Sequence, residues 1–190
     1  MPGIRSEMSA TTKATLKVIR PMTAKEERDA VGAAVKYLSG KLSQRYQIFP
    51  AELRIEKPST PKAAPKRAIA VLIFDYENRR TTEVLVNPQA RPLRTTDLTG
   101  YQPAFLAEEI ARACDIAESD ERVARVSRAR GVFASAFGPH SHGERGARLV
   151  GLRYAAADKR RGVRVLAEAV VDLSQQELVN FEDLRQTGGQ

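Results

Sequence analysis

The chain carries one short pattern twice, and the spacing between the two copies constrains how the chain can fold. Three residues recur with the same identity 85 residues later, as in the step from position 83 to position 168: Glu83 and Glu168, Val86 and Val171, Leu93 and Leu178. A period of this size is longer than the roughly 20–50 residues of a solenoid repeat. The spacing therefore predicts two related small domains in tandem.

The first half of the chain has the pattern of one helix followed by an antiparallel sheet. Thr23 and Glu26 form a capping box before an amphipathic segment, which predicts a helix from Ala24 to Leu42. Apolar runs separated by turn residues predict the strands that follow: 46–56 with a break at Pro50, 68–74, 81–86 and 93–95. The proline-rich stretch 58–65 is expected to be a surface loop.

The second half of the chain repeats this order of elements. Pro103 suits the first position of a second helix, and 119–121 suits the cap of a shorter helix that stops at Gly131. Three strands are predicted to follow: 149–154, 163–172 and 177–182. We therefore expect an α+β fold of two tandem domains, each a helix packed on an antiparallel sheet.

The expected domain organisation has four parts: a disordered leader at 1–22, a first domain at 23–100, a second domain at 101–185 and a tail at 186–190. The leader is polar and has neither the apolar core nor the cleavage site of a secretory signal. No apolar run approaches the roughly 20 residues of a membrane-spanning helix. We expect a cytoplasmic protein with no membrane partner.

The charge of the chain raises the question of an acidic partner. The formal net charge is +8 and the pI is about 9.9, values that are common among nucleic-acid-binding proteins. The basic residues, however, are spread along the chain and are not interleaved with aromatic side chains, as they are in single-strand-binding surfaces. A solvated basic face is the favoured interpretation, and nucleic-acid binding is kept as an alternative.

Few residues offer reactive chemistry. His140 and His142 stand one residue apart, a spacing that lets two histidines of a strand reach one metal ion. A closed tetrahedral site needs about two more ligands, and Glu144 is the only carboxylate nearby. An exposed polar loop is the favoured interpretation, with weak copper, zinc or nickel binding as the sharper hypothesis. Cys114, the single cysteine, lies in an apolar helical stretch and is expected to be an inert thiol.

One junction of the chain carries a recognisable sequence. It consists of Asn78–Val86, Gly100–Phe105 and the acidic pair Glu108–Glu109. With these segments, the stretch from Thr23 to Leu184 resembles the second and third N-terminal domains of copper amine oxidases. The family builds each of these domains as a small cystatin-like unit, so the resemblance implies two tandem cystatin-like domains.

The same resemblance bears on catalysis. In that family the chemistry belongs to a large C-terminal β-sandwich, which carries a quinone-forming tyrosine in an Asn-Tyr-Asp/Glu setting and three copper-binding histidines. Tyr76 lies between Asp75 and Glu77 without that asparagine, and the chain has two histidines. The resemblance therefore implies neither catalytic residues nor a bound cofactor in this chain.

Three function hypotheses follow. The first is a non-catalytic, stand-alone interaction or assembly module for a separately encoded oxidase-type enzyme, acting through a protein partner or as a homodimer. The second is a small-molecule-binding protein or small enzyme that uses a pocket between helix and sheet, a hypothesis that rests on fold analogy. The third is a basic nucleic-acid-binding protein.

Overall fold

The structure is a computed structural model that describes residues 20–56, 65–138, 146–158 and 162–185. Its regular elements are α-helices and strands that form two antiparallel sheets, so the expected α+β class, with helices packed on antiparallel sheets, is confirmed. Within these described ranges, no helix is long and apolar enough to cross a membrane. The expected leader and tail lie largely outside the described residues.

The chain divides into two compact units. The first unit contains three segments: the chain up to Leu42, Ile48–Ile73 and Thr82–Leu98. The second unit contains three others: Ser43–Gln47, Phe74–Thr81 and the chain from Thr99 onward. The segment Phe74–Thr81 is therefore part of the second unit, although the segments before and after it in the sequence belong to the first.

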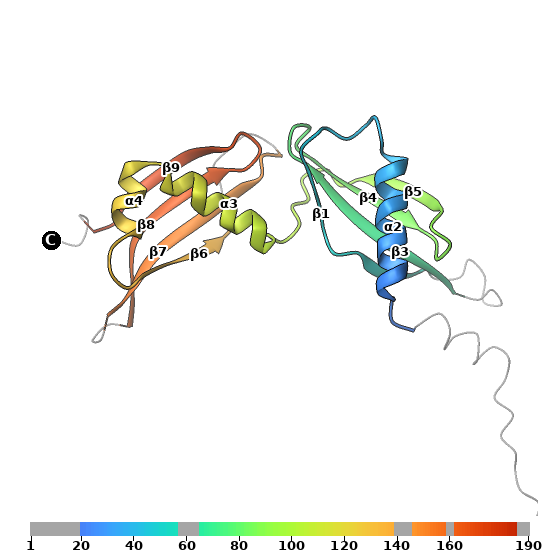
Figure 1. Ribbon diagram of the computed structural model, residues 1–190, viewed down its shortest axis with the longest axis horizontal. Helices are drawn as coiled ribbons and strands as arrows, with labels where there is room; N and C mark the ends of the chain where they lie inside the picture. Colours follow the sequence, from blue (N-terminus) through green and yellow to red (C-terminus); the bar gives the residue numbers. More distant parts are fainter. Residues whose placement is uncertain (1–19, 57–64, 139–145, 159–161, 186–190) are drawn as a thin grey trace, which may run out of the picture. The chain divides into compact units, whose positions relative to one another are not determined.

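The first unit has one described helix, α2 (Ala24–Tyr37), which lies against one face of the first sheet (Figure 1). The predicted capping box is present: the Glu26 N–H donates to Thr23 Oγ1 at 3.2 Å, and the Thr23 N–H donates to Glu26 Oε2 at 2.9 Å. The helix ends at Tyr37, earlier than predicted. The reason is local, because Gly40 takes a left-handed φ of +84° that turns the chain away from the helix.

Five strands form the first sheet: β1 (Tyr46–Ile48), β2 (Glu52–Glu56), β3 (Lys66–Asp75), β4 (Arg80–Val86) and β5 (Pro92–Asp97). Their order is β1-β3-β4-β5, and β2 also pairs with β3. Pro50 lies between β1 and β2, where the sequence predicts a break. A proline has no N–H to donate to a strand ladder, so it interrupts this edge of the sheet.

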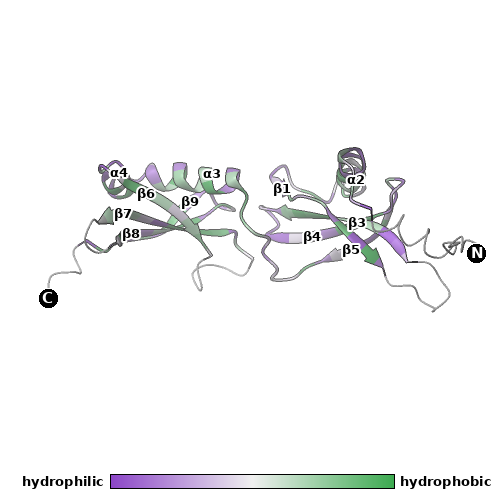
Figure 2. Ribbon diagram, turned by 90° about the horizontal axis from the view of Figure 1, so that it is seen from below, coloured by the Kyte–Doolittle hydropathy of each residue, from purple (hydrophilic) through white to green (hydrophobic). Residues whose placement is uncertain are grey.

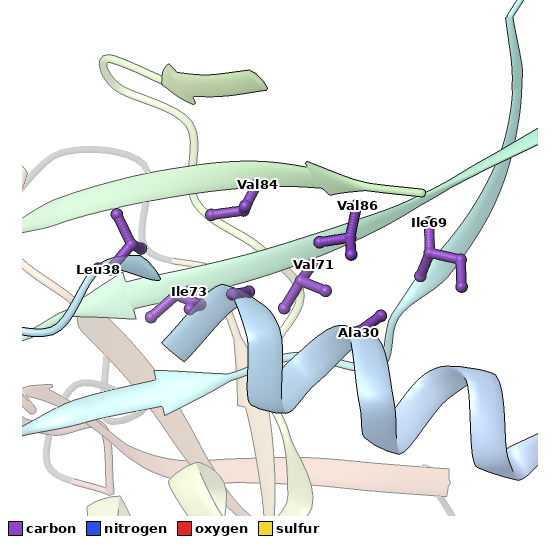
Figure 3. Close-up of a cluster of buried hydrophobic side chains, with 8 residues drawn as sticks. Ala30, Leu38, Ile69, Val71, Ile73, Val84 and Val86 are labelled. Carbon is purple, nitrogen blue, oxygen red and sulfur yellow. The ribbon is translucent and has the colours of Figure 1, made fainter. Parts of the chain in front are cut away.

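The core of the first unit fills the space between α2 and its sheet. It consists of eight buried apolar side chains (Figure 3): Ala30, Ala34, Leu38, Ile69, Val71, Ile73, Val84 and Val86. The strand residues among them recur at every second position, so they share the face that α2 covers. Removal of this apolar surface from water stabilises the unit.

Two helices, α3 (Ala107–Glu118) and α4 (Glu121–Ser127), cover one face of the second sheet (Figure 1). Helix α3 is amphipathic, and Figure 2 shows hydrophilic and hydrophobic stretches along it. The expectation that Pro103 occupies the first helical position is wrong. Helix α3 begins at Ala107, after Leu106 with an extended backbone (ψ 157°), because the carbonyl oxygens of Pro103 and Ala104 accept hydrogen bonds from the Arg148 side chain.

Four strands form the second sheet: β6 (Val132–Phe137), β7 (Leu149–Asp158), β8 (Gly162–Asp172) and β9 (Glu177–Asp183). Their order is β6-β7-β8-β9, and each neighbouring pair is antiparallel. Strands β7, β8 and β9 match the three predicted strands, whereas β6 is not predicted from the sequence. Its residues are small or apolar on both faces, so it lacks the contrast that marks a half-buried strand.

The repeated residues occupy corresponding strands of the two sheets. Val86 lies in β4 and Val171 lies in β8, and both are fully buried. The β4–β5 ladder shifts register between Leu85 and Val86, and the β8–β9 ladder does so between Val170 and Val171. The two irregularities are thus separated by the same step as the repeated residues. A common origin of the two units stays a prediction.

Gly146 illustrates a close backbone approach inside the second unit. Its φ is +86°, and a Cβ atom at this position would lie 2.7 Å from the carbonyl oxygen of Arg79. Gly131 has a similar φ of +77° but faces open space. We expect Gly131→Ala to destabilise the protein by about 1 kcal/mol through its left-handed backbone. Gly146→Ala should cost clearly more, because the Arg79 backbone must also move; equal losses in urea unfolding would contradict this.

Candidate interaction surface

The most deeply buried charged side chain of the second unit is Arg148, which immediately precedes β7. The structure gives a partner to each of its five guanidinium N–H groups. Two bonds go to the Glu109 carboxylate, from Nε to Oε1 at 2.9 Å and from Nη2 to Oε2 at 2.7 Å. Nη1 donates to Gln102 Oε1 and to the Pro103 carbonyl oxygen, and Nη2 also donates to the Ala104 carbonyl oxygen. This guanidinium is saturated by the protein itself.

The Glu109 carboxylate is equally well satisfied. Besides the two bonds from Arg148, it accepts one from the Tyr76 hydroxyl at 2.7 Å and one from the Leu106 N–H at 3.1 Å. The Leu106 bond also caps the first turn of α3. Burial alone would raise the pKa of Glu109, but the hydrogen bonds from Arg148, Leu106 and Tyr76 outweigh it and lower the pKa. The carboxylate therefore stays ionised at neutral pH.

Aromatic rings enclose this ion pair. The guanidinium carbon of Arg148 lies 4.5 Å from the centre of the Phe105 ring and 5.5 Å from that of Phe74. Rings at these distances attract the cation through their π faces and shield the pair from water. Because Arg148 and Glu109 have their bonding capacity met within the unit, we interpret this cluster as a device that orders the start of α3 against the sheet.

The acid stability of the protein should depend on Glu109. The pKa of Glu109 is lowered in the folded state. Its contribution to the free energy of unfolding is therefore present at a pH above the ordinary glutamate pKa of 4.5, and it is lost as the pH falls through the folded pKa. Glu109→Gln removes this titration. We expect the urea midpoint of the wild type to fall more steeply than that of Glu109→Gln between about pH 5 and pH 3. Parallel pH profiles would show that Glu109 does not carry this dependence.

Two buried tyrosines of the second unit differ in one respect that allows a matched test. The Tyr76 hydroxyl donates to Glu109, whereas the Tyr154 hydroxyl has no hydrogen-bond partner among the described residues. Tyr76→Phe should destabilise the protein by about 1.5–3 kcal/mol, the usual value for a hydrogen bond to a charged group. Tyr154→Phe should be neutral or stabilising, since it removes an unpaired buried hydroxyl. Equal losses of stability in thermal unfolding would contradict both assignments.

The histidine pair singled out in the sequence, His140 and His142, falls in 139–145, outside the described residues. Its weak binding of copper, zinc or nickel stays a prediction. Within the ranges that the structure describes, no group of three or more His, Cys, Asp or Glu side chains is arranged to hold a metal ion. A titration of metal against wild type and a His140→Ala/His142→Ala variant tests the pair directly.

The remaining reactive groups have structural surroundings. Cys114 lies half-buried on α3, where burial raises its pKa and Glu118 and Asp115 raise it further, as expected for an inert thiol. Asp120 caps α4 by accepting the Arg122 N–H at 2.9 Å. Hydrogen bonds from the Arg122 side chain and backbone lower the pKa of Asp120 to about 2. Asp120 therefore belongs to a helix cap rather than to a paired-carboxylate site.

The face of the second sheet opposite α3 and α4 is the candidate interaction surface. Register pairs Phe133, Ser135 and Phe137 of β6 with Ala155, Arg153 and Gly151 of β7. These positions alternate with the buried Leu152 and Tyr154, so they point away from the helices. We call this side the open face. Its small or buried members are Gly151, Ala155 and Val170, and its other residues are Phe133, Ser135, Phe137, Arg153, Glu168, Asn180 and Glu182.

The open face presents aromatic and charged groups to solvent. Phe133 is 47% exposed. The Phe137 ring lies over Gly151, where an added Cβ would meet it at 2.6 Å, and the Arg153 guanidinium carbon lies 5.1 Å from the centre of that ring. Arg153 also donates to Glu168 at 2.8 Å. Exposed aromatic rings together with arginine are the residue types enriched in protein–protein interfaces.

Sequence patterns do not single out the residues of this surface or of the buried pair. Arg148 looks like any charged residue before an apolar strand, and Glu109 looks like a helix-surface residue. The one usable signal is Glu109 itself, three residues after Leu106 at the start of a helix, which is the position of a capping carboxylate. Nothing in the sequence links Glu109 to Arg148.

Comparisons with known proteins give a structural likeness. No family model matches the chain, and no curated protein matches it by sequence. A copper-containing benzylamine oxidase from Hansenula polymorpha matches 80% of this chain with a TM-score of 0.56 and 12% sequence identity. This chain spans 28% of that oxidase. At this identity the match shows a shared fold.

A second solved structure is weakly similar. The C-terminal domain of Bacillus megaterium YpeB matches 86% of this chain and 64% of its own chain, with a TM-score of 0.27 and 10% identity. A TM-score at that level carries no argument.

The match to the benzylamine oxidase supports the expected resemblance to copper amine oxidases at the level of the fold. The assignment to their second and third domains stays a prediction.

Proposed function

We propose that this protein is a non-catalytic interaction or assembly module for an oxidase-type enzyme encoded separately. The observation that carries the proposal is the fold shared with a minor part, 28%, of a benzylamine oxidase chain. In that oxidase most of the chain lies outside the matched part. A chain with the same fold is suited to associate with a larger catalytic chain rather than to replace it.

The surroundings of the buried charges support a structural use of the second unit. Arg148 and Glu109 make their hydrogen bonds to each other, to the side chains of Tyr76 and Gln102 and to nearby backbone groups. A saturated pair of this kind has no donor or acceptor left to bind a substrate. Its role in the proposal is to hold α3 on the sheet and so to keep the open face rigid.

The open face supplies the surface for a partner. Phe133 and Phe137 offer apolar area on the edge strand β6, and Arg153 and Glu168 offer charges beside them on the central strands β7 and β8. Aromatic and arginine side chains that become buried contribute most of the binding energy of an interface, and charged groups also set its orientation and association rate. We therefore place the oxidase-type partner on this face.

Affinity capture of the tagged chain from native lysate tests the proposal. The captured fraction should oxidise benzylamine, measured as oxygen consumption, whereas the purified chain alone should not. A Phe133→Ser/Arg153→Glu variant should lose the captured activity. Arg54→Glu, an exposed change on the first sheet, serves as the matched control and should retain it. Captured material without oxidase activity, or equal capture by both variants, would count against the proposal.

The alternative of a small-molecule site stays a prediction. A hollow of about 500 Å³ is lined by residues of α3 and α4 and their caps: Glu118, Ser119, Glu121, Ala124, Arg125 and Arg128. A second, of about 350 Å³, is lined by strand residues of the first sheet: Arg54, Ile55, Glu56, Glu83, Leu85 and Arg94. Neither of these two hollows lies between a helix and a sheet, the place where the sequence led us to expect a pocket.

The nucleic-acid alternative also stays a prediction. Several arginines of the second unit pair with carboxylates, as Arg122 does with Asp120 and Arg185 does with Asp183. Such pairs reduce the positive field that a phosphate backbone would meet. Binding to nucleic acid that falls steeply with added salt would favour this alternative over the interaction module.

A further inference from the structure

Strand β6 forms one edge of the second sheet (Figure 1). Among the described strands it pairs only with β7, in continuous register from Val132 to Phe137. The three residues of β6 at positions 133–135 are exposed. The outer backbone N–H and C=O groups of such an edge are ready to pair with another strand.

The other sheet edges carry features that discourage strand pairing. Strand β9 has the acidic residues Glu177, Glu182 and Asp183 and an irregular register. Strand β5 starts at a proline and has a register shift, β2 carries Glu52, Arg54 and Glu56, and β1 is only three residues long. Charges, prolines, bulges and short length are devices by which natural sheets block edge pairing. Strand β6, with the sequence Val-Phe-Ala-Ser-Ala-Phe, has none of them.

We propose that β6 is a dimerisation edge, on which β6 of a second copy of this chain pairs antiparallel. Two identical antiparallel strands are related by a two-fold axis perpendicular to the sheet. The residue at this axis therefore lies opposite the same residue of the other copy. With the axis at Ser135, Phe133 of each copy lies opposite Phe137 of the other, and Ala134 lies opposite Ala136. The two sheets then join into one of eight strands, with the helices of both copies on the same side.

The chemistry of β6 favours a second copy as the occupant. Opposed aromatic pairs on the open face stabilise strand pairing, and the alanine pairs on the other face let the strands approach without steric conflict. No charged residue of β6 meets its like across the axis. If β9 paired with β9 of a second copy about a two-fold axis at Asn180, Glu177 of each copy would lie opposite Asp183 of the other. Like charges in direct opposition destabilise a strand pair.

This inference goes beyond the proposed function, because it concerns an edge of the sheet and a partner identical to the chain. Sedimentation of the full chain over a concentration series provides the first test. The mass of the wild type should rise from 20.9 kDa toward twice that value. Ser135→Lys places two like charges at the axis and should raise the dissociation constant at least about tenfold. Asn180→Lys, the matched change on β9, should behave as wild type.

A cysteine at the axis tests the register. Directly opposed residues bring their Cβ atoms to about 4.5–5.5 Å, so a small movement reaches the roughly 3.5–4.5 Å of a disulfide. In a Cys114→Ser background, Ser135→Cys should therefore form an interchain disulfide under mild oxidation, and Asn180→Cys should not. A constant mass of 20.9 kDa for the wild type would overturn the proposal. A dimer that survives Ser135→Lys and is not crosslinked by Ser135→Cys would overturn it as well.

Discussion

Arg148→Ala is expected to lower the free energy of unfolding by about 3–5 kcal/mol, the usual effect of removing one partner of a buried ion pair. The loss is large because the Glu109 carboxylate stays buried without the two charge-assisted hydrogen bonds that Arg148 supplies. The same change frees the carbonyl oxygens of Pro103 and Ala104. A single domain has a total stability of about 5–15 kcal/mol, so the second unit of the variant should be near its unfolding threshold.

Urea unfolding followed by circular dichroism measures this loss, and Arg153→Ala provides the control. Arg153 pairs with Glu168 at a similar distance but on the exposed open face, so its removal should cost less than about 1 kcal/mol. Replacing both buried charges, as in Arg148→Met/Glu109→Leu, should recover part of the loss because neither charge is then left alone. Equal losses for Arg148→Ala and Arg153→Ala would contradict the structural role of the buried pair.

Ile69→Ala is expected to destabilise the first unit by about 2–5 kcal/mol, the range for truncation of a buried isoleucine. Ile69 is almost completely buried on the face of the sheet that α2 covers (Figure 3). Its truncation removes apolar contacts with the helix and leaves a cavity that the surrounding side chains fill only in part. Ile69→Val, which removes one methylene, should cost about 0.5–1.5 kcal/mol.

Hydrogen exchange followed by mass spectrometry locates the effect of Ile69→Ala. Faster exchange should appear in peptides from α2, β3 and β4, since they form the core of the first unit. Ile55→Ala, at an exposed position of β2, should change stability by no more than about 0.5 kcal/mol. A loss for Ile69→Ala as small as that for Ile55→Ala would mean that α2 does not pack on this face of the sheet.

The sequence predicts those elements whose signals are local. The capping box of Thr23 and Glu26 places the start of α2, and the continuous apolar run at 68–74 places β3. Both signals come from neighbouring residues, so no knowledge of the rest of the fold is needed. Strand β6 has no such signal, since Ala134, Ser135 and Ala136 give neither face a distinct polarity.

The buried pair could not be predicted for a different reason. Arg148 and Glu109 are separated by 39 residues, and their contact exists only after α3 has packed on β7. Neither residue type predicts burial, because charged side chains are almost always exposed unless paired. The same contact explains why Pro103 does not begin a helix, so one tertiary interaction accounts for two features that local patterns do not reveal.

The central claim, that this chain works by associating with an oxidase-type enzyme, is tested most directly by the size of the native assembly. Native lysate is separated by size exclusion, and the chain is followed with an antibody while each fraction is assayed for benzylamine oxidation. The account predicts that the chain elutes together with the oxidase activity, at a mass well above twice 20.9 kDa. Elution of the chain only as a monomer or a homodimer, apart from the oxidase activity, would contradict it.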